Sequence, residues 1–248
     1  MKKGIRVLCL VLALLLFSAF AIGSGSTDAT EKTDSDTTAA GDVTVAADTA
    51  EYELGDGIVR VWTNSIDTKW IMVAVPVKNT GTTDLYLSTG TIDVEDASGT
   101  LVQSISMVSV YPQVLQPGET AYYYEETLFD GGSEDGLTVV PHVDVEKATV
   151  DCIRYELSEI QVKDQEYNSA HVVGRVENTT DTAESMAYVV ANLYDTDGNF
   201  LAQEFTILDN ELGAGEKMGF ETGSTAYEFN ADEVGSYEVY GFPYQYQF

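Results

Sequence analysis

Apolar and polar residues alternate in short runs along most of the chain. In the run 69–79, every second residue from Ile71 to Val77 is apolar, and this period of two is typical of a β-strand with one buried face. The run 169–178 shows the same alternation. After the first 21 residues, no segment sustains the 3.6-residue period of an amphipathic helix. The pattern therefore predicts a chain built from short strands.

Turn-forming residues separate the apolar runs about every ten residues. Clusters of Asn, Asp, Gly and Pro stand at 79–81, 95–99, 116–119 and 196–199. In the last of these, Gly198 supplies the positive backbone angle that a tight hairpin needs. Several short strands per hundred residues predict an all-β fold with immunoglobulin-like β-sandwiches, although a similar pattern could close into a barrel.

For two residues on the predicted strands, the sequence also predicts the surroundings. Pro76 cannot donate a hydrogen bond to a neighbouring strand, so its strand is expected at a sheet edge or beside a local irregularity. His171 lies on the face opposite the apolar residues of its strand. Its side chain is therefore expected in solvent or in a cross-strand contact.

One stretch of the chain is repeated 99 residues later. "VKNTGTTDLYL", Val77 to Leu87, returns as "VENTTDTAESM", Val176 to Met186. Residues that recur at this offset, or at 97 for the last pair, are Asn79 and Asn178, Asp96 and Asp195, Gly99 and Gly198, and Leu115 and Leu212. A repeat of this length suits a duplicated domain with its own core. We therefore predict two tandem β-sandwich domains, at 51–149 and 150–248.

The second copy resembles a known family. "GRVENTTDTAESMAYVVANLYDTDGNFLA" and the later "LGAGEKMGFE" resemble the FxLYD domains, small extracellular modules of bacteria. Leu193, Tyr194 and Asp195 match the family name, whereas Ala191 stands in the phenylalanine position. The first copy departs further and resembles a general immunoglobulin-like surface repeat. The resemblance implies a β-sandwich outside a bacterial cell and supplies no catalytic residues.

The N-terminus has the features of an export signal. Lys2, Lys3 and Arg6 precede an apolar run of 16 residues, and small residues stand at Ala19 and Ala21. We predict a signal peptide at 1–21, while an uncleaved membrane anchor stays open because the run approaches the length of about 17 that spans a bilayer. The polar segment 22–50 is predicted to be a disordered Ser/Thr/Asp-rich spacer. The predicted location is extracellular or at the cell surface, with membrane contact only through the N-terminal segment.

Charge limits the partners. The chain carries 12 basic and 41 acidic residues, a net charge of −29, and loss of the three basic residues of the signal would make it −32. Such a surface repels nucleic acid and other polyanions. The acidic residues are expected to keep an all-strand protein soluble and to protect its sheet edges.

The sequence offers little chemistry for catalysis. Cys152 is the single cysteine after the predicted signal, which excludes an internal disulfide in the mature chain, and His142 and His171 are the only histidines. No G-x-S-x-G or H-E-x-x-H motif occurs. Glu125 and Glu126 are neighbours on a strand and are expected to point to opposite faces. We therefore predict that the protein is not an enzyme and has no resident cofactor.

Two acidic loops are candidate calcium sites. "FDGGSEDG", residues 129–136, combines Asp130, Glu134 and Asp135 with glycines that let backbone carbonyls turn inward, as calcium ligands require. A plain surface loop is the competing interpretation. "DTDGN", residues 195–199, lacks the further ligands of a calcium loop and is predicted to be a hairpin turn.

Aromatic residues supply the other binding candidate. Tyr240, Phe242, Tyr244 and Tyr246 would lie on one face of the last strand, where they could bind a sugar ring or another protein. Packing into the protein's own sandwich is the competing interpretation. Function is thus predicted as a non-catalytic secreted or cell-surface interaction or spacer module whose partner is an unknown extracellular protein or glycan. The alternative is a carbohydrate- or calcium-dependent extracellular binding protein.

Overall fold

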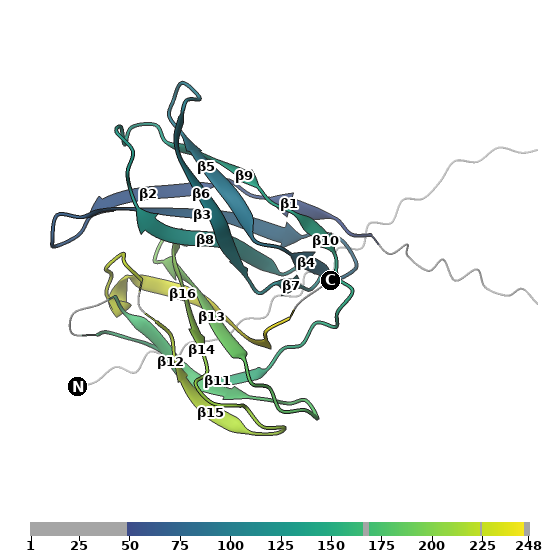
Figure 1. The fold of residues 1–248 in the computed structure, drawn as a ribbon. Coiled ribbons are helices and arrows are strands. Elements are labelled where there is room, and N and C mark those ends of the chain that lie inside the picture. The colour runs from purple at the N-terminus through teal and green to yellow at the C-terminus, as the bar shows by residue number, and fades with distance from the viewer. Residues whose placement is uncertain (1–48, 166–168, 224, 246–248) are drawn as a thin grey trace, which may run out of the picture. The chain divides into compact units, whose positions relative to one another are not determined.

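A computed structural model describes residues 49–165, 169–223 and 225–245, which form antiparallel sheets (Figure 1). The only helical element among these residues is the 3₁₀ turn η1 (Ala231–Glu233). The all-β prediction is confirmed. The predicted signal at 1–21 and almost all of the predicted spacer lie outside the described residues. In the part of the chain that the structure describes, no helix is long and apolar enough to span a bilayer.

The first half is built around one seven-stranded sheet. Its order is β1-β3-β8-β6-β5-β9, and β2 pairs with β3 beside β1. The strands of this half are β1 (Tyr52–Leu54), β2 (Ile58–Thr63), β3 (Lys69–Asn79), β4 (Leu85–Leu87), β5 (Gly90–Glu95), β6 (Leu101–Tyr111), β7 (Val114–Leu115), β8 (Thr120–Leu128), β9 (Thr138–His142) and β10 (Val145–Lys147). A small second sheet has the order β10-β4-β7.

Strand β6 changes partner along its length. Its residues up to Val108 pair with β5, and those from Ser109 to Tyr111 pair with β8. At the change, Met107 adopts a φ of 57°, a left-handed conformation that is uncommon for a residue with a side chain. The bend lets one strand serve two parts of the sheet, which curls into half a barrel.

The second half contains two three-stranded sheets, with orders β11-β12-β15 and β14-β13-β16. Its strands are β11 (Glu156–Lys163), β12 (His171–Glu177), β13 (Ala187–Asp195), β14 (Phe200–Ile207), β15 (Lys217–Glu221) and β16 (Val234–Pro243). Pairing follows the first half: β12 pairs with β15 as β3 pairs with β8, and β13 pairs with β14 and β16 as β5 pairs with β6 and β9. The sequence repeat is therefore also a repeat of topology.

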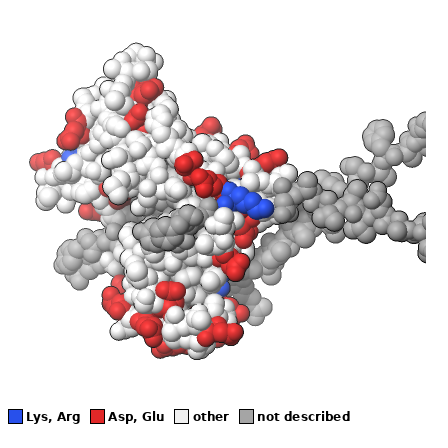
Figure 2. Space-filling model, turned by 45° about the vertical axis from the view of Figure 1, so that its right-hand side comes forward, with Lys and Arg blue, Asp and Glu red and all other residues white. Residues whose placement is uncertain are grey.

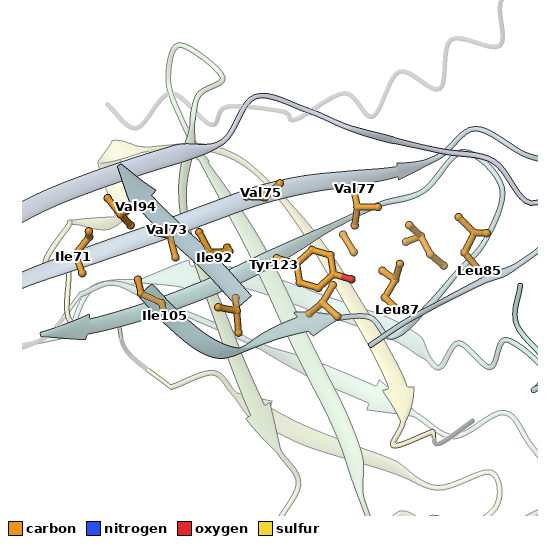
Figure 3. Packing of buried hydrophobic residues seen from close by; sticks show 14 of the residues in the cluster. Ile71, Val73, Val75, Val77, Leu85, Leu87, Ile92, Val94, Ile105 and Tyr123 are labelled. Carbon is orange, nitrogen blue, oxygen red and sulfur yellow. The ribbon is translucent and has the colours of Figure 1, made fainter. Parts of the chain in front are cut away.

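Each half has its own hydrophobic core. In the first, the alternating residues Ile71 to Val77 of β3 meet Ile92 and Val94 of β5 and the buried ring of Tyr123 (Figure 3). In the second, Val172 and Val176 of β12 are in one cluster with buried residues of β13 such as Val189 and Leu193. The predicted apolar face of both alternating runs is confirmed.

The repeated asparagines hold the loops of their own halves together. Asn79 is fully buried and its Nδ2 donates to the carbonyl oxygens of Thr83 and Leu115, both at 2.8 Å. Asn178 is equally buried and its Nδ2 donates to Thr182 and Leu212, at 2.7 and 3.0 Å. Each side chain thus donates to one buried carbonyl, that of Leu115 or Leu212, and to one partly buried carbonyl in a loop of its own half.

The repeated aspartates form equivalent turns. Asp96 Oδ1 accepts hydrogen bonds from the backbone of Ser98 and Thr100, and Asp195 Oδ1 accepts them from Asp197 and Asn199. The glycines of these turns, Gly99 and Gly198, have φ of 78° and 86°, which side-chain-bearing residues rarely adopt. The hairpin predicted at 195–199 is confirmed.

Two local expectations have different outcomes. Pro76 lies in a strand that is paired on both sides, but it faces the gap between β1 and β2, where only Gly55 N–H donates to its carbonyl, at 2.9 Å. The predicted irregularity is therefore correct and the edge position is not. For His171, the position in solvent is wrong, because the residue is 7% exposed, whereas the cross-strand contact is correct: its Nε2 lies 3.3 Å from Oε1 of Glu221 on the neighbouring strand β15.

Candidate functional site: a cleft between the two halves

The two halves pack against each other through one face of β3 and β8 in the first half and one face of β14 in the second, and both of these faces are buried. Met72 and Ala74 of β3 and Tyr122 of β8 cluster with Phe200 of β14, whose ring lies 4.2 Å from that of Tyr122. This contact explains why β3 and β13 are apolar at consecutive positions, because a strand covered on both faces does not alternate. The residues that the structure describes all belong to one compact unit.

Arg60 fastens the first half to β14 of the second. Its Nη1 donates to the carbonyl of Leu201 at 2.9 Å, and its Nη2 lies 3.4 Å from the carbonyl oxygen of Phe200. The guanidinium also stands 4.4 Å from the ring centre of Tyr227. Contacts of a cation with carbonyls and an aromatic face favour a fixed arrangement of the two halves.

A cavity of about 360 Å³ opens where β6 and β8 approach β14. This volume lies within the range of small-molecule sites. The side chains that give it its chemical character are Tyr111, Tyr124, Glu125, Glu126, Glu204 and Phe205. Phe205 is 48% exposed, whereas Glu204 is 1% exposed. We refer to this cavity as the inter-half cleft.

Glu126 is held in the cleft by contacts to both halves. Its Oε1 accepts a hydrogen bond from the Tyr124 hydroxyl at 2.7 Å, and its Oε2 accepts one from the backbone N–H of Ala226 at 2.5 Å. Burial raises its pKa, and the hydrogen bonds and the charge of Arg60 act in the opposite direction. Burial also raises the pKa of its neighbour Glu125, which borders the same cavity.

Glu204 is a carboxylate in a core position. Its Oε2 accepts a hydrogen bond from the hydroxyl of Thr222 at 2.5 Å and lies 3.3 Å from the backbone nitrogen of Val172. Its Oε1 is buried and has no hydrogen-bond partner. Burial raises the pKa of this side chain to about 7, with the charge of Glu126 adding to the effect. Glu204 is therefore poised to change its charge near neutral pH.

The aromatic face predicted on the last strand is partly covered by the first half. Tyr111 of β6 stacks on Tyr188 of β13 at 5.6 Å and lies 6.3 Å from Phe242, which is 3% exposed. Tyr240 and Tyr244 pack against the same cluster, and Tyr246 lies outside the described residues. Phe242 thus contributes to the joint between the halves, an arrangement that neither sequence interpretation foresaw.

The loop considered as a candidate calcium site is exposed at all three carboxylates, Asp130, Glu134 and Asp135. Glu134 pairs with Lys69, and the backbone nitrogens of Asp130 and Asp135 contact Gln103 and Ser133. Nowhere in the described ranges do three His, Cys, Asp or Glu side chains form a group able to hold a metal ion. Calcium binding at this loop stays a prediction.

The remaining reactive side chains are engaged in structural contacts. Cys152 is half-buried with Sγ 3.8 Å from the carbonyl of Val114, and burial raises its pKa to about 11, so its thiol stays protonated at neutral pH. His142 lies 3.0 Å from Asp93, a carboxylate partner like that of His171.

Sequence reasoning passed over Glu204, although a signal was present. The strand "FLAQEF", residues 200–205, carries one carboxylate among apolar residues. Its equivalent one repeat earlier is Ile105, because Glu204 pairs with Ala191 as Ile105 pairs with Ile92. Aligning the copies would therefore have shown a charge in place of a core isoleucine.

Acidic side chains are spread over the face shown in Figure 2, and basic side chains occupy few places on it. Comparison with protein-family models and with curated proteins gives no match for this chain. The geometry of its own residues is thus what supports a function.

Proposed function

We propose that this protein is a non-catalytic interaction or spacer module, exported to the cell surface or secreted, and built from two tandem immunoglobulin-like sandwiches. The observation that carries the proposal is the use of the repeated residues. Asn79, Asn178, Asp96 and Asp195 all hold loops of their own halves by hydrogen bonds. A duplication that conserves a scaffold in this way favours a structural or presenting role over catalysis.

The joint between the halves supports a spacer of fixed length. Arg154 donates to the carbonyl of Val114 and to Glu119 Oε2, both at 2.7 Å, and so ties the connecting segment to the first half. Together with Arg60 and the aromatic clusters, this contact favours two domains that move as one body. The immunoglobulin-like assignment of each half rests on its antiparallel sheets and on the repeated strand pairing.

The N-terminal pattern supports export. A basic start and an apolar run, followed by a polar segment before Thr49, suit a folded part displayed at a distance from the membrane or released from it. The large excess of acidic residues suits an all-β protein that must stay soluble outside the cell.

The test is localisation of the full chain in a bacterium that lacks an outer membrane, with an epitope tag after Phe248. We expect the tag in the medium, or on intact cells where added protease removes it. A variant with Leu14→Arg and Leu15→Arg, which breaks the apolar run, should keep the tag inside. A native chain whose tag resists protease until the cells are lysed would contradict the proposal.

N-terminal sequencing of the exported protein separates the two forms of the proposal. A start near Ile22 indicates a cleaved, secreted protein. A start at Met1 in the membrane fraction indicates an anchored one.

A further inference from the structure

The curled sheet of the first half has two free edges that approach each other. In the described part of the chain, β2 pairs with β3 alone and β9 pairs with β5 alone, so one side of each strand has no partner strand. The two edges touch at one end, because a Cβ at Gly57, just before β2, would overlap Val139 Cγ2 of β9. A free edge presents backbone N–H and C=O groups that another strand can pair with.

The second half is joined at the equivalent edges. Its β11 pairs with β12 as β2 pairs with β3, and its β16 pairs with β13 as β9 pairs with β5. The backbone N–H of Tyr155, the residue before β11, donates to the carbonyl of Gly241 in β16 at 2.7 Å. A Cβ at Gly241 would also lie 3.1 Å from Leu157 of β11. The edges are therefore linked in the second copy and unlinked in the first.

The opening between β2 and β9 is lined by residues of the first core. Val59 and Val61 of β2, Leu137, and Val139 of β9 pack against that core and are only partly buried. A cavity of about 300 Å³ lies beside Val59, Val61, Leu137 and Glu134. A strand added here would place every second side chain on these aliphatic residues. The opening thus has the backbone edges and the apolar floor that an extended peptide needs.

Acidic side chains surround the opening. Glu134 lines the cavity, Asp130 and Asp135 belong to the same loop, and Asp56 stands at the other end, where the edges touch. All four side chains are exposed, and one of them, Glu134, pairs with Lys69. The chain carries a net charge of −29, which adds to the attraction for a basic partner.

We propose that the opening between β2 and β9 binds an extended segment of a partner protein, which pairs with both edges, turns aliphatic side chains towards the first core and carries Lys or Arg on its other face. Backbone pairing supplies affinity in this mode of binding, and the alternate side chains supply specificity. The inference deepens the proposed function by naming the chemistry of the partner, and it rests on the interaction role of the protein and not on its export.

The surroundings of the opening favour a basic peptide over two other occupants. None of the described residues that line the cavity is aromatic, so a sugar ring finds no stacking surface there. A second copy of this chain carries the same large negative charge and is repelled by the acidic side chains around the opening.

The test is titration calorimetry of the full chain, kept soluble in a non-ionic detergent, with the peptide acetyl-Lys-Val-Lys-Val-Lys-Val-Lys-amide. A peptide of the same composition, with all its lysines before its valines, keeps the charge and loses the alternation. A third peptide, N-methylated at its valines, loses backbone donors. We expect one saturable site for the alternating peptide with a Kd of about 0.1 mM, and binding about tenfold weaker for each of the other two.

Amide hydrogen exchange locates the bound peptide. We expect the alternating peptide to slow exchange in β2 (Ile58–Thr63) and β9 (Thr138–His142), because their free backbone groups become paired. Exchange in β11 and β16 should stay unchanged, since the second half is already linked at the equivalent edges.

Substitutions sharpen the location. Val61→Lys should weaken binding about tenfold or more, because it places a like charge where the valines of the peptide dock. Val140→Lys is the matched control: Val140 pairs with Asp93 on the outer face of β9, so the affinity should not fall. Glu134→Gln should weaken binding several-fold by removing one acidic side chain from the opening.

Several results would overturn the proposal. Equal affinity for the three peptides would show attraction by charge alone, and slowed exchange outside β2 and β9 would place the peptide elsewhere. The absence of saturable binding, or unchanged affinity in a folded Val61→Lys protein, would also contradict it. If Val61→Lys does not fold, the N-methylated peptide and the exchange measurement on the native chain decide. Localisation of the tagged chain tests export separately, so a failure of either proposal is recognised without the other.

Discussion

Residues 51–149 and 150–248 share several strand pairs, yet β6 places Ile105 in a hydrophobic core where β14 places Glu204. Ile105 is 6% exposed among aliphatic neighbours. Glu204 is more deeply buried still, and its partners are Thr222 and the backbone of Val172. One framework thus holds an apolar residue in one copy and an ionisable residue in the other.

The difference teaches where to look for function in a duplicated protein. Residues that recur, such as Asn79 and Asn178, satisfy buried backbone groups and are required in both copies. A carboxylate in place of a core isoleucine costs stability, because a buried charge is expensive unless it is paired. Glu204 borders the cleft between the halves, so the residue that differs lies close to where the two copies meet.

The largest effect should come from giving the first half the second half's residue. Ile105→Glu would place a carboxylate in an aliphatic core without an equivalent of Thr222, so we expect a loss of about 4 kcal/mol at pH 8. Urea unfolding measures it. Ile66→Glu, at a side chain that is 78% exposed, is the control and should change stability little. A loss below about 1 kcal/mol would mean that the core around Ile105 accepts a carboxylate as readily as the surroundings of Glu204 do.

Removal of either repeated asparagine should cause the next largest loss of stability, and the loss should be similar in the two halves. Asn79→Ala and Asn178→Ala each remove the side-chain donor of one buried and one partly buried carbonyl and leave a gap in a fully buried position, for an expected loss of about 3 kcal/mol. Asn210→Ala, at an exposed position, is the matched control. Unfolding free energies that differ strongly between the two copies would show that the shared framework is not used equally.

Neutralising Glu204 should stabilise the protein in a pH-dependent way. Its folded pKa of about 7 lies above the usual 4.5, so its stabilising contribution is complete below pH 4.5 and is lost as the pH rises through 7. That loss corresponds to about 3 kcal/mol, and the amide of Glu204→Gln costs about 1 kcal/mol for its own unmet donor. The variant should be about 2 kcal/mol more stable than the native protein at pH 8.

The same variant should be slightly less stable than the native protein at pH 4, where Glu204 is protonated in both the folded and the unfolded chain. Unfolding in urea at the two pH values measures the change. Glu211→Gln, at an exposed position, serves as the control for net charge. A stability difference that does not vary with pH would contradict the raised pKa of Glu204.

The smallest effect concerns the joint. Arg60→Met removes hydrogen bonds to the carbonyls of Leu201 and Phe200 and the contact with Tyr227, for an expected loss of about 1 kcal/mol. Arg175→Met, in an exposed pair with Glu159, should change almost nothing. If both substitutions have the same effect on the melting temperature, Arg60 does not fasten the halves.

Much of the fold could be predicted from local patterns. The period of two in 69–79, the turn residues around Asp195 and the 99-residue repeat are all readable without a structure, because each depends on neighbours in the chain or on the other copy. Alternation identified the buried face of β3, and the apolar residues on its other face, Met72 and Ala74, indicated a second covering layer that was not recognised.

The cleft could not be predicted in the same way. Its lining comes from distant segments, with Tyr124 and Glu126 on β8 and Glu204 on β14, and these strands meet only because the halves pack against each other. His171 shows the same limit, since its burial depends on tertiary packing and not on its place in an alternating strand. The sequence did carry one signal, the carboxylate aligned with Ile105, and it becomes visible only when the two copies are compared.

The most direct test of this account is the free energy of unfolding of Glu204→Ile in urea at pH 8 and pH 4, since this substitution makes the second half match the first at this position. The account predicts a folded protein that is more stable than the native one at pH 8 and that loses most of this advantage at pH 4, because burial raises the pKa of Glu204 to about 7. An equal difference in stability at the two pH values would contradict the claim that the two copies hold an apolar and an ionisable residue in the same buried position.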